Sequence, residues 1–254
     1  RFRQNMKKFI LILLAAGQST RFRENKQLHK INNKTIFEIC LNNIKKLNLD
    51  IKVLPIVPKN KFNIFKNICL SYNTLDPIVG GTSRQKSVYN GLKYLSNKNV
   101  TSVFIHDSAR PIISKSVINE MLKNENDEFS CIVPAIEVSD AIRKKQTKNK
   151  YKFLNKNNYI LFQTPQLCNF QDLLISHKKS TKEYDDESSL LMDNGFKIKT
   201  VLGDPKSLKI TYYNDLLLIK PFLEENMNTY ITKVGIGYDV HKLIKKNITS
   251  SDKI

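Results

Sequence analysis

The chain has 254 residues, of which 41% are hydrophobic, and this is enough to bury one substantial core with a short appendage. It carries 42 Lys and Arg against 23 Asp and Glu, a formal net charge of +19. The surplus suits a protein that handles phosphates or nucleic acid, but it is equally compatible with a lysine-rich solvated surface. No apolar run reaches the roughly 18 residues that a membrane helix requires, which argues against a membrane-spanning protein.

The four cysteines stand far apart and form no CxxC pair: Cys40, Cys69, Cys131 and Cys168. This spacing argues against a disulfide framework or zinc site and predicts reduced thiols in a cytoplasmic protein. Residues 6–16, MKKFILILLAA, have the two lysines and apolar run of a secretory signal. We interpret them as a buried strand, because cleavage there would destroy the phosphate-binding pattern that follows directly.

Short apolar runs alternate with amphipathic stretches, which predicts an α/β fold: a Rossmann-like, mostly parallel sheet with helices on both faces. Strands are expected at Phe9–Ala15, Ile51–Val57, Leu70–Val79, Val100–His106, Cys131–Ile136 and Ile198–Leu202. Helices are expected at Thr35–Asn48, where Thr35 and Glu38 form a capping box, and at Ser83–Ser96, Ser114–Lys123, Asn169–Ser180 and Asn214–Leu223.

Two stretches interrupt this alternation. Between Glu137 and Phe162 the helical period is lost, and two polar strands are expected to flank the basic turn KKQTKNKY. Such a β-hairpin has little core of its own, so we expect it to project as an arm and to pack on a second subunit. The polar residues 224–232 read as a linker after a domain at 6–223, and a new apolar strand then opens a further domain at 233–254.

Three clusters carry candidate chemistry. The first strand runs into Ala15-Ala16-Gly17-Gln18-Ser19-Thr20-Arg21, with Lys26 beyond it. Small residues let backbone N–H groups approach a triphosphate, while the two cations supply charge at its α-phosphate. This loop lacks both the GK[ST] of a Walker loop and the later glycines of a dinucleotide fingerprint. It resembles the first loop of a nucleotidyltransferase family that reads LxAAGxGxRxxxxxPK.

The other two clusters follow later in the chain. Residues 80–88, GGTSRQKSV, open a helix whose N–H groups suit an anion and whose glycines expose backbone edges to a base. Residues 103–111, VFIHDSARP, end a strand at the sheet edge where ligands bind in open α/β folds, so that Asp107 suits Mg²⁺ or a ribose and Arg110 a phosphate. Taken singly, the first is an ordinary capped turn and the second an ordinary Asp-Arg pair.

Taken in order with TPQ and DxxSLKIT, these motifs resemble the 2-C-methyl-D-erythritol 4-phosphate cytidylyltransferase family over residues 8–223. The resemblance implies a nucleotidyltransferase fold, a homodimer, and Mg²⁺-dependent transfer of CMP from CTP to methylerythritol phosphate with release of pyrophosphate. It assigns catalysis to Arg21 and Lys26, nucleotide binding to Ala15, Ala16, Gly17, Gly81, Arg84, Ser87 and Asp107, the metal to Asp107, and the substrate to Arg110, Ala141, Lys156, Thr164 and Lys209.

Departures from the family pattern fall in both the loop and the arm. Ser19 and Asn25 replace a usual Gly and Pro, while Ala141 and Lys156 stand where the family has a Thr and an Arg for the substrate phosphate of the neighbouring subunit. Ala141 cannot donate a hydrogen bond, and lysine lacks the bidentate fork of arginine, so we expect weaker or rearranged substrate binding. Asp185 adds a negative charge where a Thr is common.

The tail bears a separate resemblance. Residues 234–241, VGIGYDVH, resemble the first strand of the methylerythritol cyclodiphosphate synthase family, whose Asp-x-His pair ligates a divalent metal. Asp239 and His241 share a face of this strand, but a catalytic zinc needs about three protein ligands, so a Zn²⁺-type site is expected only in a complete second domain. The chain is thus expected to be the front of a bifunctional fusion.

Two alternatives remain open from the residues. One is another nucleotidyltransferase, acting on a ribitol phosphate or a sugar phosphate. The other is a non-catalytic nucleotide- or nucleic-acid-binding protein, although the sequence lacks the interleaved aromatic and basic residues of an RNA-binding sheet. We therefore expect no nucleic-acid and no membrane partner.

Overall fold

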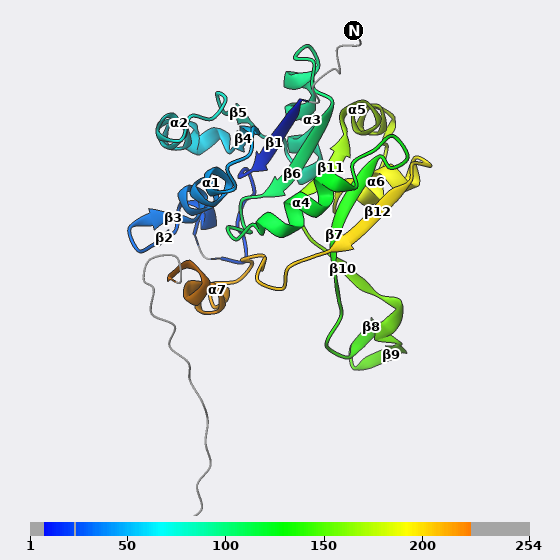
Figure 1. Cartoon of the computed structure of the whole chain (residues 1–254). Helices are drawn as coiled ribbons and strands as arrows, with labels where there is room; N and C mark the ends of the chain where they lie inside the picture. The colour runs from blue at the N-terminus through cyan, green and yellow to red at the C-terminus, as the bar shows by residue number, and fades with distance from the viewer. Residues whose placement is uncertain (1–7, 23, 225–254) are drawn as a thin grey trace, which may run out of the picture.

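The computed structural model describes residues 8–22 and 24–224, and all structural statements below concern these residues. A central sheet with helices on both faces forms the body (Figure 1). The expected linker beyond residue 224 and the expected second domain with Asp239 and His241 lie outside the described residues. Within the described part, no helix is both long and apolar enough to cross a bilayer.

The sheet has the order β10-β7-β11-β6-β1-β4-β5, with β12 paired to β7. Its strands are β1 (Phe9–Leu14), β4 (Lys52–Val57), β5 (Ile78–Val79), β6 (Ser102–Asp107), β7 (Cys131–Glu137), β10 (Ile160–Phe162), β11 (Gln166–Asn169) and β12 (Ile198–Leu202). The β1 strand pairs in parallel with β4 and β6, whereas β10 and β11 run antiparallel to their neighbours. The predicted mostly parallel sheet is confirmed.

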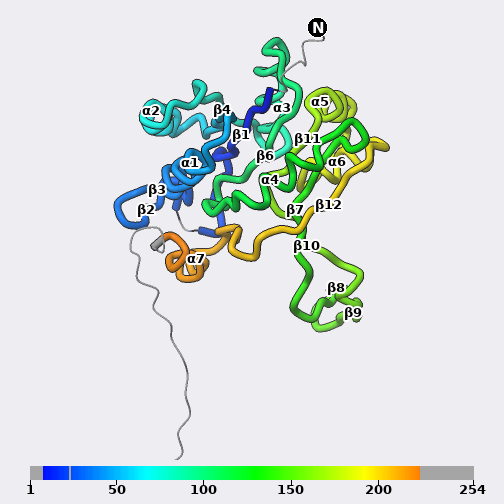
Figure 2. The backbone as a smooth tube through the Cα atoms, viewed as in Figure 1, coloured from blue at the N-terminus to red at the C-terminus, as the bar shows by residue number. Residues whose placement is uncertain are grey.

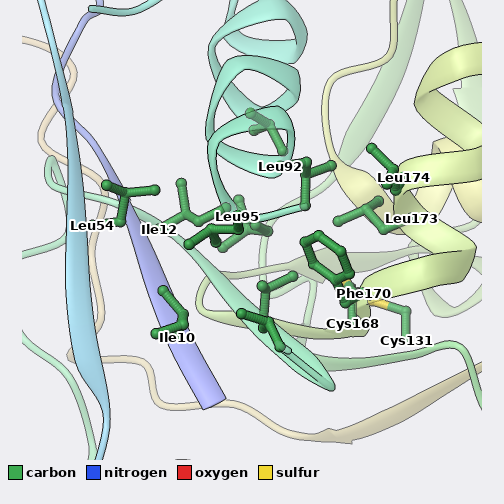
Figure 3. Packing of buried hydrophobic residues seen from close by; sticks show 14 of the residues in the cluster. Ile10, Ile12, Leu54, Leu92, Leu95, Cys131, Cys168, Phe170, Leu173 and Leu174 are labelled. Atoms are coloured by element: carbon green, nitrogen blue, oxygen red, sulfur yellow. Dashed lines mark hydrogen bonds between the residues drawn. The ribbon is translucent and has the colours of Figure 1, made fainter. Parts of the chain in front are cut away.

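Both faces of β1 are buried, and this makes a continuous apolar run fold as a central strand. Ile10 and Ile12 face helices α3 (Arg84–Leu95) and α5 (Phe170–Lys179), whose side chains pack over them in Figure 3. Leu11 and Leu13 alternate onto the opposite face. There they pack with α1 (Ile36–Lys46), α2 (Phe62–Ser71) and α4 (Lys115–Lys123).

Hydrogen bonds at the helix starts confirm the predicted boundaries of the longer helices. Thr35 caps α1 in the predicted capping box with Glu38. Ser83 caps α3 through the Lys86 N–H, and Asn169 caps α5. The last predicted helix forms as α7 (Asp215–Glu224). All four cysteines are buried, and none of them forms a disulfide in the described residues.

The predicted strand at Leu70–Val79 is wrong at its start. Residues 62–71 form α2, and only Ile78–Val79 joins the sheet. No side chain caps the start of α2, so the sequence carries no helix-start signal there. Only Phe65 and Cys69, spaced i, i+4, are buried on this helix, which gives a weak helical pattern. The strand β11 and the seven-residue helix α6 (Glu187–Asp193) were not predicted either, and α6 is too short to show a helical period.

The arm projects from the body, as Figure 2 shows clearly. It consists of β8 (Ile142–Thr147) and β9 (Lys150–Leu154), which pair antiparallel with each other only. The last residues of the range predicted for the arm, Ile160–Phe162, return to the central sheet as β10. A small separate pair, β2 (Lys30–Ile31) and β3 (Lys34–Thr35), leads into α1.

The core allows a direct test of the sheet. Phe104 on β6 is 0% exposed, whereas Leu202 on the edge strand β12 is 83% exposed. We expect Phe104→Ala to lower the free energy of unfolding by about 3–5 kcal/mol, because it leaves a cavity between β6 and the helices on that face of the sheet. Leu202→Ala is the control and should change it by about 0.5 kcal/mol or less. Urea denaturation measures both, and equal effects would contradict this packing.

Candidate active site

A cavity of about 280 Å³ opens where β1 and β6 end. The carboxyl ends of neighbouring parallel strands are where ligands bind in open α/β sheets. Four segments form its wall: the loop after β1, the start of α3, the end of β6, and the segment after β12. The lining residues are Leu14, Ala16, Gly17, Gln18, Lys26, Gln27, Gly81, Thr82, Ser83, Arg84, Ser87, Asp107, Ala109 and Lys209.

The two residues of the loop after β1 that depart from the family pattern adopt conformations open to the residues they replace. Ser19 has φ +55°, the left-handed region that favours glycine, and its Oγ accepts a hydrogen bond from the Lys26 N–H at 3.2 Å. Asn25 has φ −66°, a value that proline also adopts, and its side chain accepts from the Leu28 N–H. A Cβ at Gly17 would meet no other protein atom within 4 Å, so packing does not require a glycine here. The missing side chain instead leaves space open in the cavity.

Lys26 reaches from this loop to the segment after β12. Its Nζ donates to the Ile210 carbonyl at 2.6 Å. Burial lowers the pKa of the Lys26 ammonium to about 8, and the neighbouring charge of Lys209 acts in the same direction. An anion in the cavity would relieve this repulsion, so the site is prepared for a negatively charged ligand.

The start of α3 packs tightly against the first loop. A Cβ at Gly80 would lie 2.3 Å from the Ala16 Cβ, so only glycine allows this approach. The Gly81 N–H donates to the Ser87 Oγ at 3.0 Å, and the Ser87 hydroxyl donates to the Ser83 carbonyl at 2.8 Å. The start of α3 therefore lines the same cavity as Lys26, and the positive end of a helix dipole suits an anion there.

Asp107 is the charged centre of the site. Its Oδ1 accepts from the Arg84 Nε at 3.1 Å, and its Oδ2 lies 2.6 Å from the Lys209 Nζ. Burial alone raises the pKa of this carboxyl, but the charges of Arg84 and Lys209 outweigh it and hold the pKa well below its ordinary value. Asp107 is therefore ionised.

Glu187 on α6 completes this network from behind. Its two oxygens accept from the two terminal nitrogens of Arg84, at 2.8 and 3.0 Å, in the bidentate geometry that fixes a guanidinium plane. The side chain of Glu187 is only 2% exposed. Arg84 is thus held between two carboxylates and directs its Nε to Asp107.

Thr164 and His106 fix the backbone beside Asp107. The Asp107 N–H donates to the Thr164 Oγ at 3.2 Å, and the Thr164 hydroxyl donates to the His106 Nδ1 at 3.0 Å. The His106 Nε2 donates to the Arg110 carbonyl at 2.9 Å. Burial lowers the pKa of His106 to about 4, which agrees with the neutral tautomer that this chain of hydrogen bonds requires.

Most residues predicted for the nucleotide come together. Eight residues with a predicted site role line the cavity: Ala16, Gly17, Lys26, Gly81, Arg84, Ser87, Asp107 and Lys209. Ala15 is fully buried beneath the loop. Thr164 and Arg110 do not line the cavity. Thr164 accepts a hydrogen bond from the Asp107 N–H, and Arg110 donates to the Ser207 carbonyl at 2.7 Å.

Three predicted residues lie elsewhere. Arg21 is exposed, with its guanidinium 5.7 Å from the centre of the Tyr212 ring. Ala141 is exposed at the base of the arm, and the Lys156 Nζ donates to the Ser139 carbonyl at 2.6 Å. The sequence analysis missed Glu187, because an acid in the polar run DDESS carries no signal of burial.

The pair of half-buried Arg84 and buried Glu187 predicts a large effect on stability. Glu187→Ala removes one of the two carboxylates that hold Arg84, so we expect the free energy of unfolding to fall by about 2–3 kcal/mol, less than for a fully buried pair. Glu120→Ala is the control, because Glu120 pairs with Lys123 on the surface at 3.6 Å and its loss should cost about 1 kcal/mol or less. Chemical denaturation of both variants measures the difference, and a loss at Glu187 as small as that at Glu120 would contradict the network.

Comparison with known proteins agrees with this geometry. Residues 9–225 match the family model of IspD, 2-C-methyl-D-erythritol 4-phosphate cytidylyltransferase. The chain is 31% identical over 229 residues to the Clostridium botulinum protein of that name, covering 87% of this chain and 99% of the relative. It is 33% identical over 235 residues to the bifunctional enzyme IspD/IspF of Pelagibacter ubique, covering 92% of this chain and 60% of that relative.

A solved structure gives the same result for the fold. The Francisella tularensis 2-C-methyl-D-erythritol 4-phosphate cytidylyltransferase superimposes with a TM-score of 0.66 at 30% identity, covering 84% of this chain and 98% of that one. The chain spans about 60% of the length of the bifunctional relative from Pelagibacter ubique. From the cavity, the motifs that line it and these matches, we conclude that the chain belongs to the 2-C-methyl-D-erythritol 4-phosphate cytidylyltransferase family.

Proposed function

We propose that this protein transfers CMP from CTP to 2-C-methyl-D-erythritol 4-phosphate, giving 4-diphosphocytidyl-2-C-methyl-D-erythritol and pyrophosphate. The observation that carries the proposal is the cavity in which Lys26, Arg84 and Lys209 surround the one carboxylate of Asp107 in a member of this family. Three cations against one lining anion suit a triphosphate.

The reaction needs no general base. A phosphate monoester has a second pKa of about 6, so the acceptor phosphate is mostly a dianion at neutral pH. One of its oxygens attacks the α-phosphorus of CTP, and the bond from that phosphorus to the β-phosphate oxygen breaks. Pyrophosphate leaves with the bonding electron pair. Catalysis is then positioning and neutralisation of the charge on the phosphoryl oxygens.

The residues divide the work by their place at the cavity. Lys26, together with Arg21 from the same loop, stabilises the transition state at the α-phosphorus. Gly81 and Ser87, which line the cavity at the start of α3, lie beside the cytosine. Arg84 holds Asp107, and the backbone at Ala16 and Gly17 cradles the phosphates, while Ala15 anchors the loop through its N–H, which donates to the Ile56 carbonyl.

The substrate side lies at Lys209, Arg110 and Thr164. Lys209 lines the cavity and is held by Asp107. Thr164 bonds the backbone of Asp107, while Arg110 holds the segment that leads to Lys209 through the Ser207 carbonyl. Lys209 contacts the acceptor directly in this proposal, and the other two set its position.

A divalent metal would be bound mainly by the phosphates of the substrate, together with one protein carboxylate. The described residues contain no group of three or more His, Cys, Asp or Glu side chains that could hold a metal. Mg²⁺ is commonly bound by one or two carboxylates together with substrate phosphates. Asp107 is the carboxylate that lines the cavity and would be its protein ligand, in competition with Arg84 and Lys209, which hold its two oxygens in the free protein. When bound, Mg²⁺ neutralises triphosphate charge. A cytoplasmic location and the absence of a nucleic-acid partner stay predictions.

The arm is proposed to form a homodimer. Tyr151 and Phe153 alternate onto one face of β9 and are 58% and 66% exposed, although no other element pairs with the hairpin. A two-stranded hairpin is marginal alone, so a second copy of the chain is the proposed cover. In that dimer Ala141 and Lys156 face the substrate of the partner subunit, and the lost hydroxyl at Ala141 weakens substrate binding.

The comparison with the bifunctional relative supports the proposed division into domains. We propose a cytidylyltransferase domain at 6–223, a linker at 224–232, and the start of a cyclodiphosphate synthase domain at 233–254. Metal binding by Asp239 and His241 then requires the remainder of that second domain.

Lys26 gives the sharpest test of the reaction. We expect Lys26→Ala to fold normally but to lower kcat by about 10² to 10³, by analogy with loss of one transition-state donor. Pyrophosphate release with CTP and methylerythritol phosphate measures this. Near-normal release would reject the role of Lys26, and equal use of other triphosphates or of ribitol phosphate would reject the proposed substrates.

The pKa of Lys26 adds a prediction about pH. Because this pKa is about 8 in the free protein, the ammonium loses its proton as pH rises through this value. kcat/KM for CTP should therefore fall above pH 8, since this parameter follows the free enzyme. Lys26→Arg should keep its charge and lose this alkaline limb, whatever its absolute rate. An unchanged limb in Lys26→Arg would assign it to another group.

The dimer is tested by a charge placed on the arm. We expect Phe153→Glu to yield a monomer by light scattering, because a carboxylate in an apolar interface is costly to desolvate. Leu70→Glu is the control, since Leu70 on α2 is equally exposed, at 71% against 66%, but lies outside the arm. A Phe153→Glu protein that remains dimeric would contradict the interface.

A further inference from the structure

Arg21 stands apart from the other cations of the site. Arg84 and Lys209 each form an ion pair with Asp107, and the Lys26 Nζ donates a hydrogen bond to the Ile210 carbonyl. Within residues 8–22 and 24–224, Arg21 forms no ion pair, and it does not line the cavity. Its recorded partner is the ring of Tyr212, 5.7 Å from the guanidinium carbon to the ring centre. This distance is within the range of a cation–π interaction.

The ring that Arg21 contacts is carried by a braced segment. The N–H groups of Thr211 and Tyr212 donate to the Asp215 carboxylate at 2.7 and 2.9 Å, where α7 begins. The next side chain, Tyr213, packs on Phe22 and His29 with ring centres 5.7 and 5.5 Å apart. Tyr212 and Tyr213 thus contact the chain on both sides of Lys26, at Arg21 and Phe22 before it and at His29 after it.

A ring has an advantage over a carboxylate at this position. Arg21 and Lys26 are close enough for their charges to repel, and Arg21 acts to lower the pKa of Lys26. Without a partner, Arg21 would turn to solvent before a ligand arrives. A carboxylate would hold it but would also compete with the incoming phosphate, whereas an aromatic face attracts the cation weakly and leaves its N–H donors free.

We propose that Tyr212 is a positioning residue, whose ring face holds Arg21 in one place, outside the cavity lining, on the loop that also carries Lys26, ready for the triphosphate. The inference rests on the proposed catalytic role of Arg21. Once the triphosphate is bound, its own charge attracts Arg21, so Tyr212 acts on capture of CTP rather than on turnover. Its contribution therefore belongs in KM for CTP and not in kcat.

The test is a double-mutant cycle with Arg21. Tyr212→Leu should raise KM for CTP about two- to fivefold, the range expected for an exposed cation–π contact, with kcat nearly unchanged. Tyr212→Phe retains the ring and should recover most of the loss. In an Arg21→Ala background, Tyr212→Leu should raise KM no further, because the partner is already gone.

Tyr94→Leu is the matched control, since Lys98 lies 4.5 Å over the Tyr94 ring outside the site. It should leave both constants unchanged. A rise in KM that is equally large with and without Arg21, no rise at all, or a loss in Tyr212→Phe as large as that in Tyr212→Leu would overturn the proposal. A fully active Arg21→Ala protein would instead overturn the catalytic role of Arg21, and the role of Tyr212 with it.

Discussion

The ionised carboxylate of Asp107 is buried at the end of β6, and the site is arranged around the need to compensate that charge. A buried charge is costly unless it is paired and hydrogen-bonded. Arg84 from α3 and Lys209 from the segment after β12 provide the pairing, and Glu187 on α6 fixes Arg84 in turn. One acid thereby ties three distant segments of the chain to the carboxyl edge of the sheet. The three cations that line the cavity, Lys26, Arg84 and Lys209, carry more positive charge than is needed to neutralise Asp107. The excess positive charge is available to attract a triphosphate.

The backbone prepares the cavity before any side chain acts. The two-faced burial of β1 sets the point where its loop leaves the sheet, and Gly80 lets the start of α3 come within contact of Ala16. The loop holds Ser19 at positive φ and Asn25 at a proline-like φ, so each adopts a conformation open to the glycine or proline that it replaces in the family pattern. Function in this protein therefore depends on loop conformations that the sheet holds in place.

The sequence was informative wherever a signal was local. The apolar runs of β1, β4 and β6, the capping box at Thr35 and the helix starts at Ser83 and Asn169 were predicted, because periodicity and capping depend on neighbouring residues. The uncapped α2 and the short α6 were not. In the site, the glycines, Lys26, Arg84 and Asp107 were predicted by motif and lie together at the cavity. Glu187 and Tyr212 act through contacts 103 and 191 positions away along the chain, to Arg84 and Arg21, and no local pattern reports such a contact.

The account stands on the claim that the cavity beside Asp107 takes the triphosphate of CTP. A crystal structure of the protein with CTP and Mg²⁺ tests this most directly. We expect the phosphates against the backbone of Gly17 with Lys26 at the α-phosphate, and the cytosine at Gly81 and Ser87. Nucleotide bound elsewhere, with this cavity holding only solvent at saturating CTP, would contradict it.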